Sequence, residues 1–156
     1  MRETATDLEW LGGLIASSVD RAGPFLRSSF QMPEHSLTAG QLVRCLDGLP
    51  VIALATVTSG GEPRVAPIGA LFVKARLYVP TLATAARARQ VQRNPAISAS
   101  YFQGVDIAVI IHGRADPVGV DDQEFHLLDG LYQEQAGASI RTPGAAATRI
   151  SPRSTR

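Results

Sequence analysis

Thiols are nearly absent from this sequence of 156 residues, in which Cys45 is the one cysteine. An intrachain disulfide and a cysteine-based metal cluster are therefore excluded, and a reducing, cytoplasmic setting is expected. Long apolar runs are missing too, since none approaches the ~18 residues of a membrane span. The first residues, Met-Arg-Glu-Thr, lack the basic and then apolar pattern of a signal peptide. The sequence thus predicts a cytoplasmic protein without a membrane partner.

An excess of charge of one sign is also missing, because 15 lysines and arginines face 14 aspartates and glutamates. This balance gives no bulk attraction to nucleic acid, and we expect no nucleic-acid partner. The three histidines, His35, His112 and His126, have no metal-ligand spacing, so no metal site is expected. Lys74 is the only lysine. Nearly all positive charge is therefore arginine, which binds phosphate and carboxylate groups bidentately.

Helices are indicated by apolar periodicity or composition in four stretches, 7–19, 37–46, 84–94 and 121–135. Thr6, Ser36 and Asp121 are their expected N-caps where a polar residue precedes the pattern. The stretch 21–34 carries Gly23 and two prolines and is expected to be an irregular linker. Cys45 lies within the second helix pattern, where a buried small residue is the favoured interpretation. No Gly-x-Ser-x-Gly nucleophile motif is present, so no catalytic side chain is identified.

Strands are indicated between the helices, at 51–58, 64–73, 76–79, 96–102 and 105–111. Gly60-Gly61 predicts a hairpin, Lys74-Ala75 predicts a tight turn, and Pro67 predicts an edge or a bulge. The last of these strands is expected to be the most buried of all. Hairpin-linked strands favour an antiparallel sheet that closes into a small barrel. The expected class is α+β, mainly antiparallel β.

A phosphate site is suggested where the third helix begins. A helix N-terminus offers free N–H groups and the positive end of a dipole. Thr84, Arg87 and Arg89 would add a hydroxyl and two guanidinium groups there. From composition alone, a solvated arginine face is the alternative interpretation.

A family resemblance joins these features. The residues at 54–57, 61–67, 77–81, 87–95 and 112–115 resemble the pyridoxamine 5'-phosphate oxidase-like family of flavin-binding split β-barrels. The resemblance covers about 42–118, and 148–153 looks like the closing strand of that barrel. It implies a split-barrel flavin-binding domain at 37–156, after a helix and linker extension at 1–36. It also implies FMN at a homodimer interface, where residues of the partner chain complete the pocket.

The resemblance carries a cofactor site onto particular residues. The implied cofactor-binding residues are Arg64, Val65, Ala66, Pro67, Pro80, Thr81, Thr84, Arg87, Arg89 and His112. Ala85 and Ala86 stand where the founding oxidase has hydroxyl-bearing and charged residues, which favours weaker FMN binding or a deazaflavin coenzyme. The stretch 149–156 has no Arg-x-His substrate motif, so pyridoxamine 5'-phosphate is not the expected substrate.

The function implied is that of an FMN- or deazaflavin-dependent oxidoreductase acting on an unknown small-molecule electron donor or acceptor. The alternative is a non-catalytic flavin- or haem-binding protein on the same fold. A DNA-binding regulator is disfavoured, because the helix expected at 7–19 contains no arginine.

Overall fold

The computed structural model describes residues 2–153, which divide into two compact units. The first unit comprises the residues up to Asp47 together with Phe72–Ala75, and the second comprises Gly48–Leu71 with the residues from Arg76 onward. The expected domain boundary after residue 36 stays a prediction, and residues 154–156 of that domain lie outside the described residues. No helix within the described part is long and apolar enough to cross a membrane.

The first unit is helical. It contains α1 (Ala5–Asp20), α2 (Pro24–Ser29) and α3 (Ala39–Cys45). Helices α1 and α3 contact each other, and the unit buries Leu11, Leu42, Val43 and Leu46. The irregular linker expected at 21–34 is wrong in part, because α2 begins at Pro24. Proline suits the first turn of a helix, where its missing N–H has no partner to lose.

The N-caps of α1 and α3 differ from those expected. Thr4 caps α1 instead of Thr6: the Thr4 hydroxyl accepts a hydrogen bond from the Asp7 N–H at 3.1 Å, and the Asp7 carboxylate accepts one from the Thr4 N–H at 2.8 Å. Thr38 forms the same reciprocal box on α3 with the residue three positions later, in place of Ser36. Each box satisfies two backbone donors that the start of a helix leaves unpaired.

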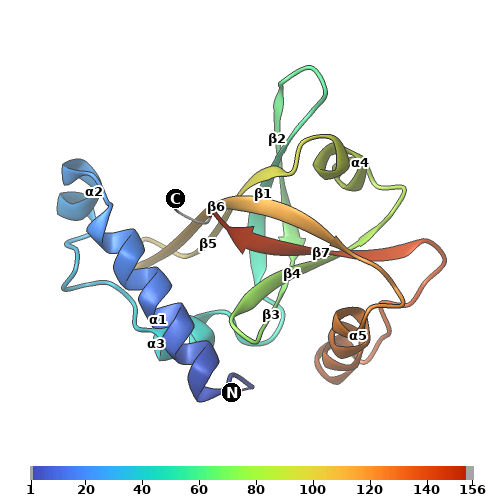
Figure 1. Cartoon of the computed structure of the whole chain (residues 1–156), viewed down its shortest axis with the longest axis horizontal. Coiled ribbons are helices and arrows are strands. Elements are labelled where there is room, and N and C mark those ends of the chain that lie inside the picture. Colours follow the sequence, from blue (N-terminus) through green and yellow to red (C-terminus); the bar gives the residue numbers. More distant parts are fainter. Residues whose placement is uncertain (1, 154–156) are drawn as a thin grey trace. The chain divides into compact units, whose positions relative to one another are not determined.

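The second unit is built on an antiparallel sheet that curls into a half-barrel (Figure 1). Its strands are β1 (Val51–Val57), β2 (Pro63–Gly69), β4 (Arg76–Leu82), β5 (Ala96–Gln103), β6 (Ile107–Val118) and β7 (Ala145–Pro152). A further short strand, β3 (Leu71–Val73), has only its first residue in this unit. Their order across the sheet is β2-β1-β5-β6-β7-β4-β3. The predicted split barrel is therefore confirmed, with β7 as its closing strand.

The turns of this sheet follow the sequence closely. Gly61, with a φ of 85°, lies in the β1–β2 hairpin, and Lys74 and Ala75, with φ values of 50° and 56°, form the tight turn before β4. Pro67 lies on β2, an edge strand, where a missing N–H costs no ladder bond to a further strand. Strand β4 runs three residues beyond the expected end and reaches Leu82.

Strand β6 corrects the expectation that 105–111 is the most buried strand. No residue from 105 to 112 is buried, Val105 is fully exposed, and Ile110 is 52% exposed. Burial in β6 begins at Gly113. An apolar composition shows that a strand avoids water, but it does not show whether its own chain or another covers it.

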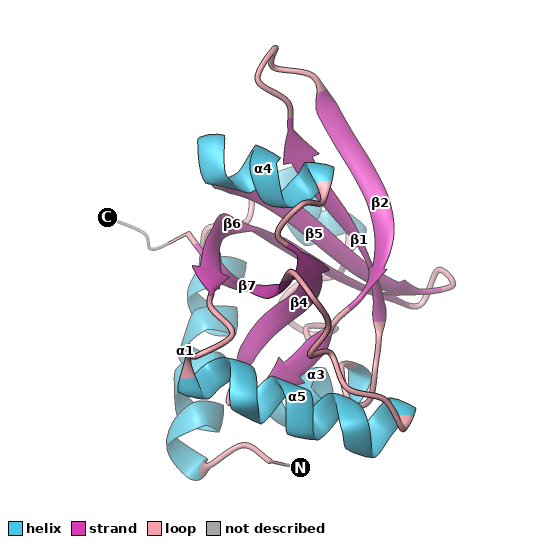
Figure 2. Ribbon diagram, turned by 90° about the vertical axis from the view of Figure 1, so that its right-hand side faces the viewer, coloured by secondary structure: helices cyan, strands magenta, loops and turns pink. Residues whose placement is uncertain are grey.

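Two helices belong to the barrel, α4 (Ala86–Arg93) and α5 (Gln123–Ala136), and they lie at opposite ends of the curled sheet (Figure 2). Thr84, expected inside α4, precedes it, and Ala85 is the N-cap. The N-cap of α5 is Asp122 and not Asp121. Its carboxylate accepts a hydrogen bond from the Gly119 N–H at 2.7 Å and so holds the preceding turn. Helix α5 buries Phe125, Leu128, Asp129 and Leu131.

Candidate cofactor site

The start of α4 offers free backbone donors. Ala85, the N-cap, makes no side-chain hydrogen bond, and the first turn contains no acidic residue. The opening N–H groups of a helix have no intrahelical acceptor, and the helix dipole places partial positive charge there. This end of α4 is therefore suited to an anionic group.

Arg87 and Thr81 meet beside this helix start. The Arg87 Nε–H donates to the Thr81 Oγ1 at 3.1 Å, which joins α4 to the end of β4. Both residues line a cavity of about 10 Å³ between α4 and the sheet, roughly the room that one water needs. Within residues 2–153, no carboxylate pairs with Arg87. A half-buried guanidinium without a counter-ion, next to unpaired helix amides, fits a phosphate group.

Arg89 and Thr84 form a separate contact. The Arg89 Nη1 donates to the Thr84 backbone carbonyl at 2.8 Å, and both residues are exposed. Arg87 and Arg89 are two positions apart, about 200° around the helix, so they lie on opposite sides of α4. The structure therefore brings Thr81 and Arg87 together, but not Arg89.

Strand β2 places its four candidate residues on two faces. Val65 and Pro67 share one face, while Arg64 and Ala66 alternate to the other, and all four are exposed. Arg64 pairs with Glu62 at 2.6 Å, and opposite it on β1 lies Thr56, which is bonded to α4. Arg64 therefore shares the α4 side of the sheet.

His112 lies on the other face, in one row with Val65. The row runs across four strands through cross-strand partners: Val65, Ala55, Ser98 and His112. Three strand spacings of about 4.8 Å make this row roughly 14 Å long. The Ser98 Oγ and the His112 Nδ1 form a hydrogen bond of 2.8 Å, so Nε2 is the ring nitrogen that remains for a ligand. The two middle positions of the row carry small side chains, Ala55 and Ser98.

Pro80 stands apart from Thr81, because neighbouring residues of a strand face opposite sides of the sheet. Thr81 and Arg87 thus meet at the helix end, with Arg64 and Ala66 on the same side of the sheet, and a second group lies on the other face: Val65, Pro67 and His112. Thr84, Arg89 and Pro80 join neither group, and the binding roles of all ten residues stay predictions. Sequence reasoning missed Ser98, Thr56 and Gln90. Gln90 alone had a local signal, since it follows Arg87 by three residues and so lies on the same helix face.

Two groups with displaced pKa values, Tyr78 and Asp129, lie beside or on α5. Burial raises the pKa of Tyr78, and the nearby Glu124 carboxylate raises it further. The hydrogen bond from Ser139 lowers the pKa of Asp129. No cluster of histidine, cysteine or acidic residues within the described chain can hold a metal ion.

Comparison with family models decides the family. The model for pyridoxamine 5'-phosphate oxidase matches residues 39–155, three quarters of the chain. The chain belongs to the pyridoxamine 5'-phosphate oxidase family. The match spans the complete sheet and α4, so both groups of candidate residues lie inside it. Comparison with curated proteins gave no match.

Solved structures share the fold of this family member at low identity. HutZ, the haem storage protein of Vibrio cholerae, superimposes with a TM-score of 0.64 at 17% identity, over 74% of this chain and 90% of that one. An F420 reductase superimposes with a TM-score of 0.56 at 18% identity, over 72% of this chain and 93% of that one. Atu2129 of Agrobacterium tumefaciens, a protein of unknown function, superimposes with a TM-score of 0.58 at 18% identity over 69% of this chain. The match spans half of the length of Atu2129.

Proposed function

We propose that this protein is an oxidoreductase that uses FMN or a deazaflavin coenzyme on a small-molecule electron donor or acceptor. The observation that carries the proposal is the start of α4, where Arg87 has no carboxylate partner among the described residues and lies beside uncapped helix amides. Cofactors of both kinds carry a phosphate that such a site can bind. The single cysteine fits a cytoplasmic compartment.

The chain's own residues would bind and orient the cofactor. Arg87 and the first amides of α4 hold the phosphate, while Thr81 holds the Arg87 side chain in place. Val65 and Pro67 provide an apolar wall for the ring, and His112, fixed by Ser98, presents Nε2 toward it. When bound, the ring supplies the hydride or electron transfer, so no side chain of this protein has to act as an acid or base.

A homodimer is part of the proposal. Four large apolar residues, Val51, Val65, Phe102 and Ile110, are exposed on the sheet face that also carries His112. Contiguous exposed apolar surface of this kind marks an interaction site. A second copy would cover this face and complete the ring pocket.

The choice between the two cofactors rests on the residues before Arg87. Ala85 and Ala86 offer neither a hydroxyl nor a charge, so phosphate binding depends on one arginine and on backbone amides. A phosphate site with so few polar side chains favours the deazaflavin over FMN, and the likeness to an F420 reductase supports the same choice.

The alternative is a haem-binding protein without turnover. The fold likeness to HutZ favours it, and His112, exposed on the sheet, is the available nitrogen ligand on the proposed ring face.

Absorption titrations of the purified protein with FMN, F420 and haem distinguish these functions. We expect saturable binding of F420 or FMN, followed by reoxidation of the bound, reduced cofactor by a quinone much faster than that of the free cofactor. Tight haem binding without binding of either flavin would establish the alternative. Binding of none of the three would disprove both.

A further inference from the structure

A buried hydrogen bond ties α4 to the sheet. The Thr56 hydroxyl donates to the Gln90 Oε1 at 2.6 Å, although the two residues are 34 positions apart. Thr56 is 3% exposed, so water does not compete for this bond. Gln90 follows Arg87 by three residues and therefore projects from the same side of the helix.

Helix α4 depends on such contacts for its placement. It has eight residues and no side-chain cap, and helices this short do not persist without tertiary support. Ala88 and Val91 supply apolar contact with the sheet. Among the described residues, two side-chain hydrogen bonds join α4 to the sheet, that of Thr56 and that of Arg87 with Thr81. The Arg87 bond belongs to the residue that is proposed to hold the phosphate, so the Thr56 bond is the one that serves only to place the helix.

Thr56 also links the two candidate arginines. It lies opposite Arg64 in the β1–β2 register, and its hydroxyl holds the helix that carries Arg87. Arg64 lies on β2 and Arg87 lies on α4. Among the described side chains, no other hydrogen bond links the surroundings of these two arginines as directly as the bond between Thr56 and Gln90.

We propose that Thr56 and Gln90 are positioning residues that hold the start of α4 at the distance from β2 that binding of the cofactor's phosphate requires. This inference rests on the proposed function. It assigns to the pair an effect on the phosphate end of the ligand alone, because Thr56 and Gln90 bond to each other and to none of the residues proposed to hold the ring.

The test compares FMN with riboflavin, which has the same ring and no phosphate. Thr56→Val keeps the side-chain shape and leaves the Gln90 oxygen without its donor. We expect FMN to bind about five- to tenfold more weakly, the value of one buried hydrogen bond, and riboflavin affinity to change less than about twofold. For a deazaflavin, F420 and its phosphate-free chromophore form the matching pair.

Two variants serve as controls. Thr56→Ser retains the hydroxyl and should restore the preference for FMN. Ser151→Ala removes a hydroxyl on β7 that donates to the Asp116 carboxylate of β6 at 2.7 Å, and this variant should leave both affinities unchanged. A readout without ligand is amide hydrogen exchange, which should accelerate in residues 86–93 of Thr56→Val and not in Ser151→Ala.

The outcomes separate this inference from the proposed function. Equal losses for FMN and riboflavin, or no loss of either, would overturn the role of Thr56 while leaving a flavoprotein. Unchanged hydrogen exchange in α4 would overturn it too. A wild-type protein that binds neither member of either pair would overturn the proposed function and this inference with it.

Discussion

Arg87 and Arg93 lie on the same short helix, yet their surroundings differ. Arg87 is half-buried at the first turn and bonded to Thr81, whereas Arg93 is exposed at the last turn. Favourable interaction with an anion falls off within the first turn of a helix. The two arginines therefore form a matched pair for testing whether the phosphate binds at the helix start.

Arg87→Ala should weaken FMN or F420 binding by about 10- to 150-fold, because a charge-assisted hydrogen bond contributes ~1.5–3 kcal/mol. Arg93→Ala should change the affinity by less than about threefold. Titration of each variant by absorbance or fluorescence gives both values. Equal losses would indicate diffuse electrostatic attraction, and an unchanged affinity in Arg87→Ala would place the phosphate elsewhere.

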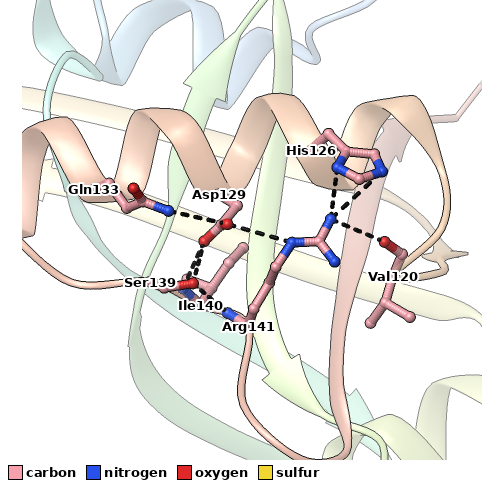
Figure 3. A network of polar contacts seen from close by, with 7 residues as sticks. All are labelled: Val120, His126, Asp129, Gln133, Ser139, Ile140 and Arg141. Atoms are coloured by element: carbon pink, nitrogen blue, oxygen red, sulfur yellow. Dashed lines mark hydrogen bonds and ion pairs between the residues drawn. The ribbon is translucent and has the colours of Figure 1, made fainter.

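Asp129 is a second residue whose surroundings set its chemistry. Figure 3 shows its buried carboxylate on α5 accepting from the Ser139 hydroxyl at 2.7 Å and from the Ile140 N–H at 2.9 Å. The Gln133 amide donates at 3.1 Å, and the Arg141 Nε lies 3.4 Å away. These donors favour the ionised form and lower the pKa of Asp129. This carboxylate holds the segment before β7 to α5, together with Arg141, which also contacts His126 and the Phe125 ring of the same helix.

Asp129→Asn should destabilise the fold by about 2–3 kcal/mol near neutral pH, because the donors around this buried position lose a charged acceptor. The pKa of Asp129 is lower in the folded state than the unfolded value of about 3.9, so its contribution is complete above that value and declines as the pH falls through it. Urea unfolding should therefore show a smaller difference between wild type and variant at about pH 3. A difference that does not change with pH would contradict this assignment.

At the scale of elements, local chemistry predicted most of the fold. The Gly60-Gly61 hairpin, the Lys74-Ala75 turn and the position of Pro67 on an edge depend on residues within a few positions of one another. The helix starts were harder, since Thr4 and Thr6 both precede acidic residues by three positions, and only the assembled chain shows which box forms. The predicted start of a helix is wrong by a residue or two where neighbouring residues offer capping boxes of nearly equal energy.

The contacts of the candidate site also divide into those that are local in the sequence and those that are not. Thr81 and Arg87 are six positions apart and joined by one short connection, so their meeting could be anticipated. The Thr56–Gln90 and Ser98–His112 bonds depend on how strands pair and where a helix packs. Strand register is a non-local property, and nothing near Thr56 in the sequence indicates that its partner lies on α4.

Gly113 shows how one element depends on the absence of a side chain. A Cβ built on it would lie 2.1 Å from the Ser151 carbonyl oxygen of β7, a backbone atom that cannot turn away. Gly113→Ala should cost about 3 kcal/mol or more, because β6 and β7 would have to separate. Gly130→Ala, in the exposed middle of α5 with nothing within 4 Å, should instead stabilise by about 0.5–1 kcal/mol. Thermal unfolding of both variants measures the contrast, and similar melting temperatures would refute the crowding at Gly113.

At the scale of the whole molecule, the apolar strand at 105–111 predicted burial that the single chain does not provide. Side chains alternate along β5 and β6, and on one face Phe102 is 63% exposed and Ile110 is 52% exposed. Neighbouring β1 and β2 add Val51 and Val65 to that face. Fully burying one side chain of this size contributes about 1.5–3 kcal/mol, so covering four of them favours association strongly.

Ile110→Glu should convert the expected dimer into monomers. The glutamate would place a charge without a partner inside an apolar contact, and the dimer dissociation constant should rise by about 100-fold or more. Cofactor affinity should fall with it, because His112 lies two residues away on the same face and the proposed second copy would complete the ring pocket. Gln135→Glu adds the same charge at an exposed position of α5 and should leave the assembly intact. Sedimentation velocity at micromolar concentration distinguishes the two species.

A wild-type protein that sediments only as a 16.6 kDa monomer would remove the dimer from the proposal. A dimer that survives Ile110→Glu would move its interface to another face, and the ring pocket would then have to be completed by this chain alone.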